Sequence, residues 1–411
     1  MNVLPQSERP LDGLVVVDFS QFLSGPLCGL KLADLGARVI KVERPGVGDL
    51  CRSLYLSDTD IDGTNSLFHA INRNKESVTA DLRDADDRAV LVELIKSADV
   101  FIQNFRPGVI ERQGFGYDDV QKINPLIIYG SISGYGEEGP WKDLPGQDLL
   151  AQARSGLLWL TGNADHAPMP MGLAVADMLA GNALTQGILA ALVGRGIHGR
   201  GALIQTSLLE AMIDFQFEVL STHLNDGQRL PQRSGINGAH AYLGAPYGVY
   251  ETKDGFMALA MTPSLKVLAD LLEISDLEPY FDDPKLMMTK RDEIKSILAA
   301  QLVARTTAEW LSVLQPADIW CSEVLDWVSL RETEAYKRLD LEQTILRNGS
   351  VPLETLRAPI RYNGATLKSE RAAPGLGANR DAIFSELIAS QKPDHENESP
   401  ISTPGAEEAR T

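Results

Sequence analysis

The sequence predicts an α/β fold with a doubly wound parallel sheet, which is an open sheet covered by helices on both faces. Between residues 14 and 133, short apolar runs typical of buried parallel strands alternate with longer segments of helical periodicity. Such alternation indicates an α/β architecture. The chain has 411 residues, 44% of them hydrophobic and 23% charged, which is enough for two or three domains with a sizeable core.

The strands follow from apolar runs that are too short for helices. The first of these runs, at residues 14–19, is almost entirely aliphatic before it reaches Asp18. The predicted strands cover residues 14–19, 37–43, 99–105 and 126–133, with an edge strand at 77–82 and a short strand at 203–206.

The helices follow from apolar residues at three- and four-residue spacing and from residues that favour helix ends. Pro26 directly follows Gly25, and proline is favoured in a first helical turn, so we expect a helix from there to residue 35. Acidic residues open the segment 84–98, where they suit the helix dipole. Further helices are predicted at residues 107–113, 147–155 and 208–223.

A longer apolar segment from Met171 to Val193 also has helical periodicity, and it contains Asp177 in the middle of the pattern. No Lys or Arg lies between Arg154 and Arg195, so no cation that is near in the chain can pair with this carboxylate. An ionised carboxylate among apolar side chains is unfavourable unless the fold supplies hydrogen bonds or charge. Asp177 is therefore either a structural acceptor or a reactive group.

Charge and composition exclude several classes of partner. The formal net charge is −18 and the pI is about 4.8, so we expect neither nucleic acid nor an anionic membrane as a general partner. Polar residues interrupt the longest apolar run, which argues against a membrane span. Three scattered cysteines and a polar N-terminal segment favour a reducing cytoplasm, and six dispersed histidines predict no metal site.

Loops rich in glycine, proline and arginine follow four of the predicted strands, at residues 20–25, 44–48, 104–108 and 134–139. Open α/β sheets bind ligands at this edge, beyond the carboxyl ends of the strands. Arg44, Arg106 and Arg112, together with the segment Asn72-Arg-Asn-Lys75, would supply local positive charge. The pattern favours a phosphate-bearing ligand, although each glycine or arginine alone is also common in structural loops. The dinucleotide and phosphate-loop fingerprints are absent.

Past residue 225 the composition shifts to Gly, Pro, Arg, Asn and Gln, as in a linker or mobile loop. A hairpin at 248–261 and helices at 265–272, 290–304 and 307–314 predict a smaller domain over residues 226–330. A return strand is expected at 357–361. Residues 391–411 lack periodicity and are expected to form a disordered tail.

Several short motifs in a fixed order give the chain a family likeness between residues 10 and 387. Together they resemble the class III CoA-transferases, a group that includes formyl-CoA transferase, carnitine CoA-transferase and α-methylacyl-CoA racemase. The motifs are Ser24-Gly-Pro26, the segment 35–45, Asn72-Arg-Asn-Lys75, Asn104-Phe-Arg-Pro-Gly108, Ser133-Gly-Tyr-Gly136, Ala176-Asp177, Gly199-Arg-Gly201 and Pro374-Gly-Leu-Gly377.

The resemblance implies an enzyme that moves CoA from an acyl-CoA donor to a carboxylic acid acceptor, with CoA as substrate and no permanently bound cofactor or metal. It also implies an interlocked homodimer. Each chain would have a Rossmann-like large domain built from residues 1–225 and 331–390. The implied nucleophile is Asp177. The implied CoA contacts are Leu23, Ser24, Arg44, Asn72, Arg73, Asn74, Lys75, Asn104, Phe105, Arg106, Arg112, Ser133, Gly134 and Tyr135.

Departures from the family pattern leave two alternatives open. Some transferases carry a glutamine where this chain has Leu23, and their glycine-rich lid corresponds to residues 235–244, which are only partly glycine. The racemases carry a histidine where this chain has Gln147, which cannot transfer a proton. The alternatives to a transferase are an acyl-CoA racemase acting at the α-carbon and a non-catalytic protein that binds CoA esters.

Overall fold

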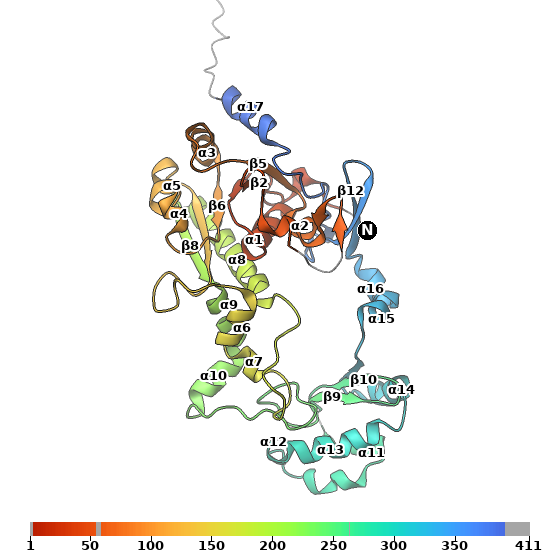
Figure 1. The fold of residues 1–411 in the computed structure, drawn as a ribbon. Coiled ribbons are helices and arrows are strands. Elements are labelled where there is room, and N and C mark those ends of the chain that lie inside the picture. Colours follow the sequence, from red (N-terminus) through yellow and green to blue (C-terminus); the bar gives the residue numbers. More distant parts are fainter. Residues whose placement is uncertain (1–2, 55–58, 263, 391–411) are drawn as a thin grey trace, which may run out of the picture.

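The computed structural model describes residues 3–54, 59–262 and 264–390 of the chain (Figure 1). The predicted disordered tail at 391–411 lies outside the described residues. The chain forms a large unit around a central sheet and a smaller unit with its own core, and two chain segments connect the two units (Figure 1).

A six-stranded parallel sheet forms the centre of the large unit, as the alternating pattern predicted. Its strand order is β5-β2-β1-β6-β7-β8. The strands are β1 (Val15–Asp18), β2 (Arg38–Glu43), β5 (Lys75–Thr79), β6 (Val100–Gln103), β7 (Ile128–Ser133) and β8 (Ala202–Ser207). The order reverses between β1 and β6, so the loops after these two strands part around a crevice.

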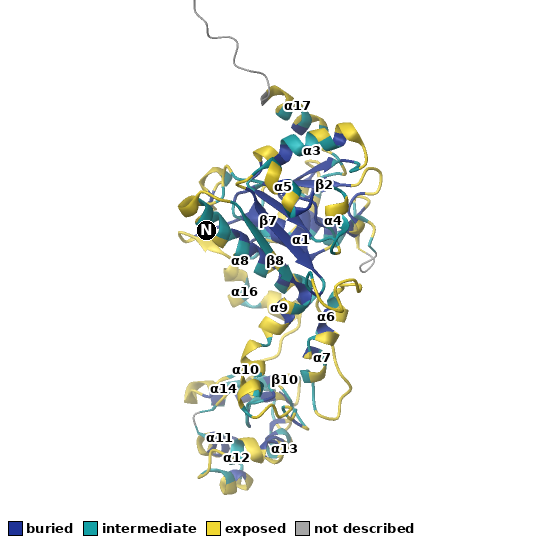
Figure 2. Ribbon diagram, turned by 90° about the vertical axis from the view of Figure 1, so that its left-hand side faces the viewer, coloured by how far each residue is buried: buried dark blue, intermediate teal, exposed yellow. Residues whose placement is uncertain are grey.

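Successive residues of each strand enter different cores. Val16 of β1 belongs to an apolar cluster with α1 (Ser24–Asp34) and α8 (Val175–His198), whereas Val17 belongs to a second cluster with α3 (Ala85–Ser97). The sheet is therefore buried on both faces, which explains why its strands are continuous apolar runs in the sequence (Figure 2).

Several predicted boundaries differ from the observed ones. The edge strand begins at Lys75 and ends at Thr79, earlier than expected. The predicted helix 208–223 is two helices, α9 (Leu208–Phe215) and α10 (Phe217–Asn225). The remaining helices of this part of the chain are the predicted α4 (Val109–Arg112) and α6 (Asp148–Arg154), and three that were not predicted, α2 (Ser66–Asn72), α5 (Tyr117–Ile123) and α7 (Leu157–Leu160).

Helix α8 is the one helix among the described residues that is long and apolar enough to span a membrane by length and composition. A helix in the core of a globular protein meets the same criterion. One face of α8 packs on the sheet, where Ala176, Ala180, Leu184 and Ile188 are completely buried. The observed packing therefore accounts for the apolar residues of this face.

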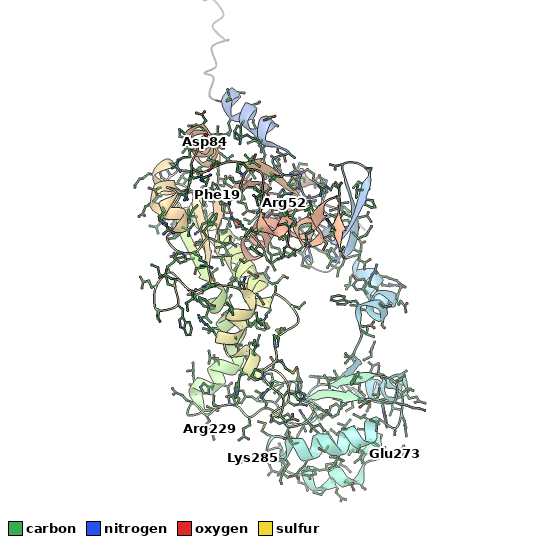
Figure 3. The ribbon with its side chains drawn as sticks, viewed as in Figure 1. Phe19, Arg52, Asp84, Arg229, Glu273 and Lys285 are labelled. Atoms are coloured by element: carbon green, nitrogen blue, oxygen red, sulfur yellow. The ribbon has the colours of Figure 1, made fainter. Side chains whose placement is uncertain are left out.

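The smaller unit has its own apolar cluster, which includes the buried side chains of Tyr250 and Trp310. Figure 3 marks this unit by Glu273 and Lys285, far from Phe19 in the large unit. Its antiparallel sheet has the order β11-β10-β9. Its elements are β9 (Gly248–Glu251), β10 (Phe256–Leu259), β11 (Cys321–Glu323), α11 (Leu265–Leu272), α12 (Leu286–Thr289), α13 (Arg291–Leu302) and α14 (Thr307–Leu314).

The chain then returns to the large unit, where the Ser77 N–H donates to the Asn379 side chain and the Ser77 hydroxyl accepts the Gly377 N–H. The return strand expected at 357–361 is wrong, because one strand ends at Leu356 and the next begins only at Arg361. The returning elements are α15 (Trp327–Glu332), α16 (Glu334–Leu339), β12 (Glu342–Arg347), β13 (Val351–Leu356), β14 (Arg361–Tyr362), β15 (Ala365–Thr366) and α17 (Arg380–Ser390). The exact domain boundaries stay a prediction.

Short elements complete the described chain and lie outside the main sheet. They are the strands β3 (Asp60–Ile61) and β4 (Thr64–Asn65) and the 3-10 helices η1 (Gln6–Glu8), η2 (Leu50–Arg52), η3 (Ser275–Tyr280) and η4 (Gln315–Ala317).

Candidate active site

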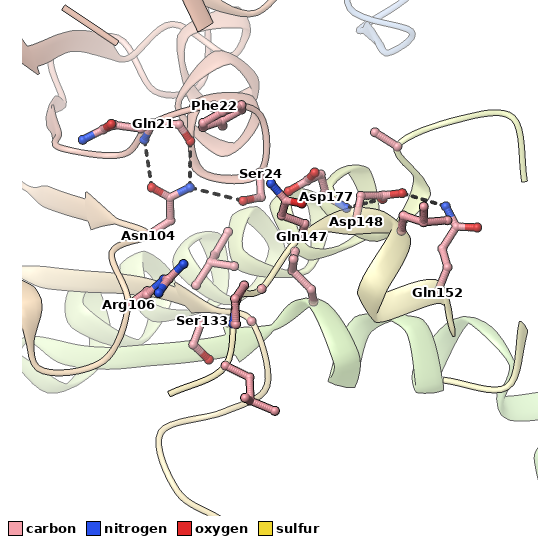
Figure 4. A pocket seen from close by; sticks show the side chains of 18 of the residues that line it. Gln21, Phe22, Ser24, Asn104, Arg106, Ser133, Gln147, Asp148, Gln152 and Asp177 are labelled. Atoms are coloured by element: carbon pink, nitrogen blue, oxygen red, sulfur yellow. Dashed lines mark hydrogen bonds between the residues drawn. The ribbon is translucent and has the colours of Figure 1, made fainter. Parts of the chain in front are cut away.

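A cavity of about 800 Å³ opens where the sheet order reverses, and Asp177 is part of its wall. The loop after β1 and the loop after β6 meet here through Asn104. Its side chain accepts from the Gln21 N–H and donates to the Gln21 carbonyl, both at 2.8 Å, and it also donates to the Ser24 hydroxyl at 3.3 Å (Figure 4). These bonds connect the two sides of the crevice.

Asp177 lies in the first turn of α8, not in the middle of a helix as the sequence suggested. The helix begins at Val175, because Asp148 of the next helix in space caps it there. One Asp148 oxygen accepts the backbone N–H of Ala176 at 2.6 Å and that of Asp177 at 3.3 Å. The other oxygen accepts the Gln152 amide at 2.6 Å, which fixes the carboxylate (Figure 4).

The N-terminus of a second helix, α1, reaches Asp177 from the other side. Gly181 allows this close approach, because a Cβ atom at this position would stand 2.6 Å from the Ser24 carbonyl oxygen. Ser24 then lies close enough to Asp177 that its hydroxyl and its backbone N–H lower the pKa of the carboxyl. Two helix N-termini, each with a partial positive charge, therefore meet at this side chain.

Burial is the main cause that raises the pKa of Asp177, to about 6, and the negative charge of Asp148 raises it further. The hydrogen bonds from Ser24 act in the opposite direction. Within the described residues, no Lys or Arg forms an ion pair with Asp177. The group is therefore a carboxylate at neutral pH that is less stabilised than an exposed one.

Six of the predicted CoA contacts line the same cavity as Asp177, while others lie elsewhere. The six are Ser24, Asn104, Phe105, Arg106, Ser133 and Gly134. Arg44 lines a neighbouring cavity of about 310 Å³, which shares Gln21 and Phe105 with the first. Both cavities also contain a cation that the sequence did not single out, Lys142 in the larger and Arg83 in the smaller.

Seven predicted contacts line neither cavity, and three of them lie outside the segment 72–75. Leu23 is buried in an apolar cluster with Phe68. Tyr135 is buried with its hydroxyl donating to the Pro145 carbonyl at 3.1 Å, whereas Arg112 is exposed near Gly108. Leu23 and Tyr135 therefore belong to the packing of the large unit, and a contact of Arg112 with CoA stays a prediction.

The segment Asn72-Arg-Asn-Lys75 is also buried, and its side chains bond to the protein itself. Lys75 pairs with Asp18 at 2.9 Å, and Arg73 pairs with Asp34 at 2.8 Å. The Asn74 side chain accepts two backbone N–H groups of the returning chain, and that of Asn72 donates to the Phe68 carbonyl. Because all four residues are buried and line neither cavity, we leave them out of the proposed site, although the side-chain oxygen of Asn72 and the side-chain amide nitrogen of Asn74 have no hydrogen-bond partner among the described residues.

Sequence reasoning missed Asp148 as the cap of α8. The signal was weak, because Asp148 is 29 positions from Asp177 and only tertiary contact brings the two together. Gln147 also lines the cavity beside Asp177 (Figure 4). In the described part of the chain, no group of three or more His, Cys, Asp or Glu side chains could hold a metal ion.

Comparisons with known proteins agree over nearly the whole chain. The sequence model of CoA-transferase family III matches residues 11–380. The chain is 35% identical to the acetyl-CoA:oxalate CoA-transferase of Acetobacter aceti, over 93% of this chain and 97% of that protein. It is 32% identical to the succinyl-CoA:glutarate CoA-transferase of Mus musculus, over 93% and 88% of the two chains. A CAIB/BAIF family protein from Brucella suis has a similar structure, with a TM-score of 0.79 and 31% identity over 94% of this chain and 100% of that one.

We predict that Lys75→Met lowers the free energy of unfolding by about 3–5 kcal/mol, because it leaves Asp18 charged and unpaired inside the protein. Denaturant titration of the purified protein measures this change. The double variant Asp18→Asn/Lys75→Met removes both charges and should recover most of the loss. Lys122→Met, at a side chain that is 76% exposed, is the matched control and should change nothing. If the Lys75→Met protein had normal stability but bound CoA poorly, Lys75 would be a CoA contact and not mainly a structural residue.

Proposed function

Because the chain belongs to CoA-transferase family III, we propose that it moves CoA from an acyl-CoA thioester to a carboxylic acid, with Asp177 as the nucleophile. Relatives with this fold and length are named CoA-transferases. The observation that carries the proposed role of Asp177 is its position: a largely buried carboxylate without a paired cation, in the wall of the main cavity.

In the proposed first step, an Asp177 oxygen attacks the thioester carbonyl carbon of the donor. The carbon–sulfur bond breaks, CoA leaves as a thiolate, and a mixed anhydride joins the acyl group to Asp177. The thiolate then attacks the aspartyl carbonyl, which releases the donor acid and forms an aspartyl-CoA thioester. The acceptor carboxylate attacks this thioester, CoA leaves again as a thiolate, and a second mixed anhydride joins the acceptor to Asp177. The thiolate then attacks the carbonyl carbon of the acceptor, which forms the new acyl-CoA and releases Asp177 as a carboxylate. Covalent catalysis of this kind divides one difficult exchange into easier steps.

The environment of Asp177 suits a nucleophile of this kind. Its raised pKa means that the carboxylate is weakly stabilised in the resting protein, so less stabilisation is lost when it forms a bond. The apolar lining from Leu173 and Leu208 limits access of water, which would hydrolyse an anhydride. Backbone N–H groups at the start of α1 are suitable donors for the oxyanion that forms during each attack.

The cations of the two cavities support a path for CoA. Arg106 and Lys142 line the cavity that contains Asp177, and Arg44 and Arg83 line the adjoining one. We propose that the phosphates of CoA lie among Arg106, Lys142 and Arg44, whose positive charge is local in a chain of net charge −18, and not at Arg83, which pairs with a carboxylate of the same cavity. The pantetheine arm would then lead along Phe105, which both cavities share, toward Asp177.

The names of relatives suggest which acids to test first. They include transferases for oxalate, glutarate and mesaconate, all of them short dicarboxylic acids. We propose a short carboxylic acid of this kind as acceptor. The alternative of a racemase has less support, because Gln147 beside Asp177 cannot transfer a proton.

We also propose that two chains form an interlocked homodimer. Large apolar side chains are exposed on the segments that connect the two units: Phe217 is 67% exposed, Trp327 80% and Val328 71%. A monomer rarely exposes such groups together, and a second copy of the chain would cover them.

For the dimer, sedimentation velocity should give a mass of about twice 44.8 kDa. Trp327→Asp/Val328→Asp should shift the population toward single chains, because it introduces charge into the covered surface. A mass of one chain for the unaltered protein at micromolar concentration would contradict this proposal.

For the nucleophile, Asp177→Asn should reduce transfer by at least about 10⁴-fold while CoA still binds, because the covalent route is lost. Turnover is measured by mass spectrometry of the CoA products from a panel of donors and acids, and binding by calorimetry. Asp165→Asn, at an exposed side chain, is the matched control and should keep normal turnover.

Hydroxylamine added with the acyl-CoA donor should convert Asp177 to a hydroxamate, which peptide mass spectrometry detects. An Asp177→Asn protein with normal turnover would show that Asp177 is not the nucleophile. Exchange of deuterium at the α-carbon without any acceptor would instead support the racemase.

The pH dependence of turnover should reflect the pKa of Asp177. The reactive form is the carboxylate, so kcat/KM should fall about tenfold per pH unit below about 6. Asp148→Asn keeps an oxygen to accept the Ala176 N–H but removes the neighbouring negative charge, so the pKa of Asp177 should decrease and the acid limb should move to lower pH. A pH profile of kcat/KM tests both statements, and an acid limb that stays unchanged in Asp148→Asn would contradict the proposed coupling.

A further inference from the structure

The loop between β1 and α1 contains a residue in a conformation that non-glycine residues seldom adopt. Phe22 has a φ of 66°, in the left-handed region. Two residues later, Ser24 begins α1 and contacts Asp177. The turn at Phe22 therefore sets the direction from which Ser24 reaches the nucleophile, and such strain persists only where the surroundings impose it.

A buried ion pair behind the loop holds this turn in place. One oxygen of Asp49 accepts the Phe22 N–H at 3.0 Å and the Cys51 N–H at 2.9 Å. Its other oxygen lies 2.8 Å from the ammonium group of Lys41, and both side chains are completely buried. Lys41 also donates to the Ser20 carbonyl at 2.7 Å. The pair thus holds the loop at Ser20 and at Phe22, on both sides of Gln21.

The ion pair does not belong to the cavity wall. Phe22 and Ser24 line the cavity, whereas Asp49 and Lys41 do not. Neither charge is among the groups that shift the pKa of Asp177. Any effect of Asp49 on the reaction must therefore pass through the shape of the loop.

We propose that Asp49, supported by Lys41, is a positioning residue of the transferase: its hydrogen bond to the Phe22 N–H holds the turn that aims the Ser24 donors at Asp177. This inference rests on the proposed nucleophilic role of Asp177. Without the bond, the loop relaxes toward a negative φ at Phe22, and Ser24 moves away from the reacting carboxylate. Donors that are held in place before reaction contribute strongly to turnover, because no reorganisation is needed when charge develops.

The test compares two double variants that differ only in the acceptor at position 49. Lys41→Met/Asp49→Asn keeps an oxygen for the Phe22 N–H, while Lys41→Met/Asp49→Leu has nearly the same shape but no acceptor. Neither variant leaves a buried charge without a partner, so both are expected to fold. Circular dichroism and thermal melting check that they do. We expect kcat of the Leu variant to be about 100-fold below that of the Asn variant, with KM for acyl-CoA within about threefold.

A third variant separates loop geometry from general damage. Adding Phe22→Gly to Lys41→Met/Asp49→Leu should recover most of the lost kcat relative to Phe22→Gly alone, because glycine adopts a positive φ without strain. Equal kcat values for the Asn and Leu double variants would overturn the inference, as would a Leu variant that Phe22→Gly does not improve.

The rate of hydroxylamine trapping distinguishes this inference from the proposed function. If the unaltered protein forms no trapped Asp177 adduct with any acyl-CoA that it turns over, the proposed nucleophile is wrong. If the unaltered protein forms the adduct and the Asn and Leu double variants form it equally fast, the nucleophile stands and the role of Asp49 is refuted.

Discussion

The site depends on a partly buried carboxylate that has no paired cation among the described residues. Asp177 lies where the N-termini of α1 and α8 meet, and the polar groups of Ser24, instead of an ion pair, lower the pKa of its carboxyl. Helix dipoles and hydrogen bonds stabilise the charge only moderately. A guanidinium at hydrogen-bond distance would lower the pKa of the carboxyl and weaken it as a nucleophile. The fold therefore keeps Asp177 ionised at neutral pH without a paired cation, as the proposed nucleophile requires.

The buried cations nearby are consistent with this constraint, because each has its own acid. Lys41 pairs with Asp49 and Lys75 pairs with Asp18, all four with side chains completely buried. Neither lysine is among the groups that shift the pKa of Asp177, and the charge that does is the negative one of Asp148. The ion pairs thus hold the backbone around the site in place. The charge of Asp177 is instead stabilised by the N-termini of α1 and α8.

The sequence predicted the parts that depend on local pattern. The strands of the central sheet are buried on both faces and therefore appear as apolar runs, and the loop at Ser24 was expected at their carboxyl ends. It misplaced the start of α8, because the apolar period extends back to Met171 while the cap that starts the helix comes from Asp148, in another segment. It also treated Lys75 as a free cation, since its partner Asp18 is distant in the sequence. Tertiary pairing of this kind leaves no periodic signal.

At position 23 this chain differs from the transferases that carry a glutamine there. Leu23 is buried among apolar side chains, so it offers no polar group to the cavity. What the loop provides is backbone geometry: Asn104 fixes both polar groups of the Gln21 backbone, Asp49 fixes the Phe22 N–H, and Ser24 presents its own donors to Asp177. Since these contacts use the main chain of the loop, side chains within it can vary while the site keeps its shape. The shape of the loop instead depends on Asn104 and Asp49, which contact it from the loops that follow β6 and β2.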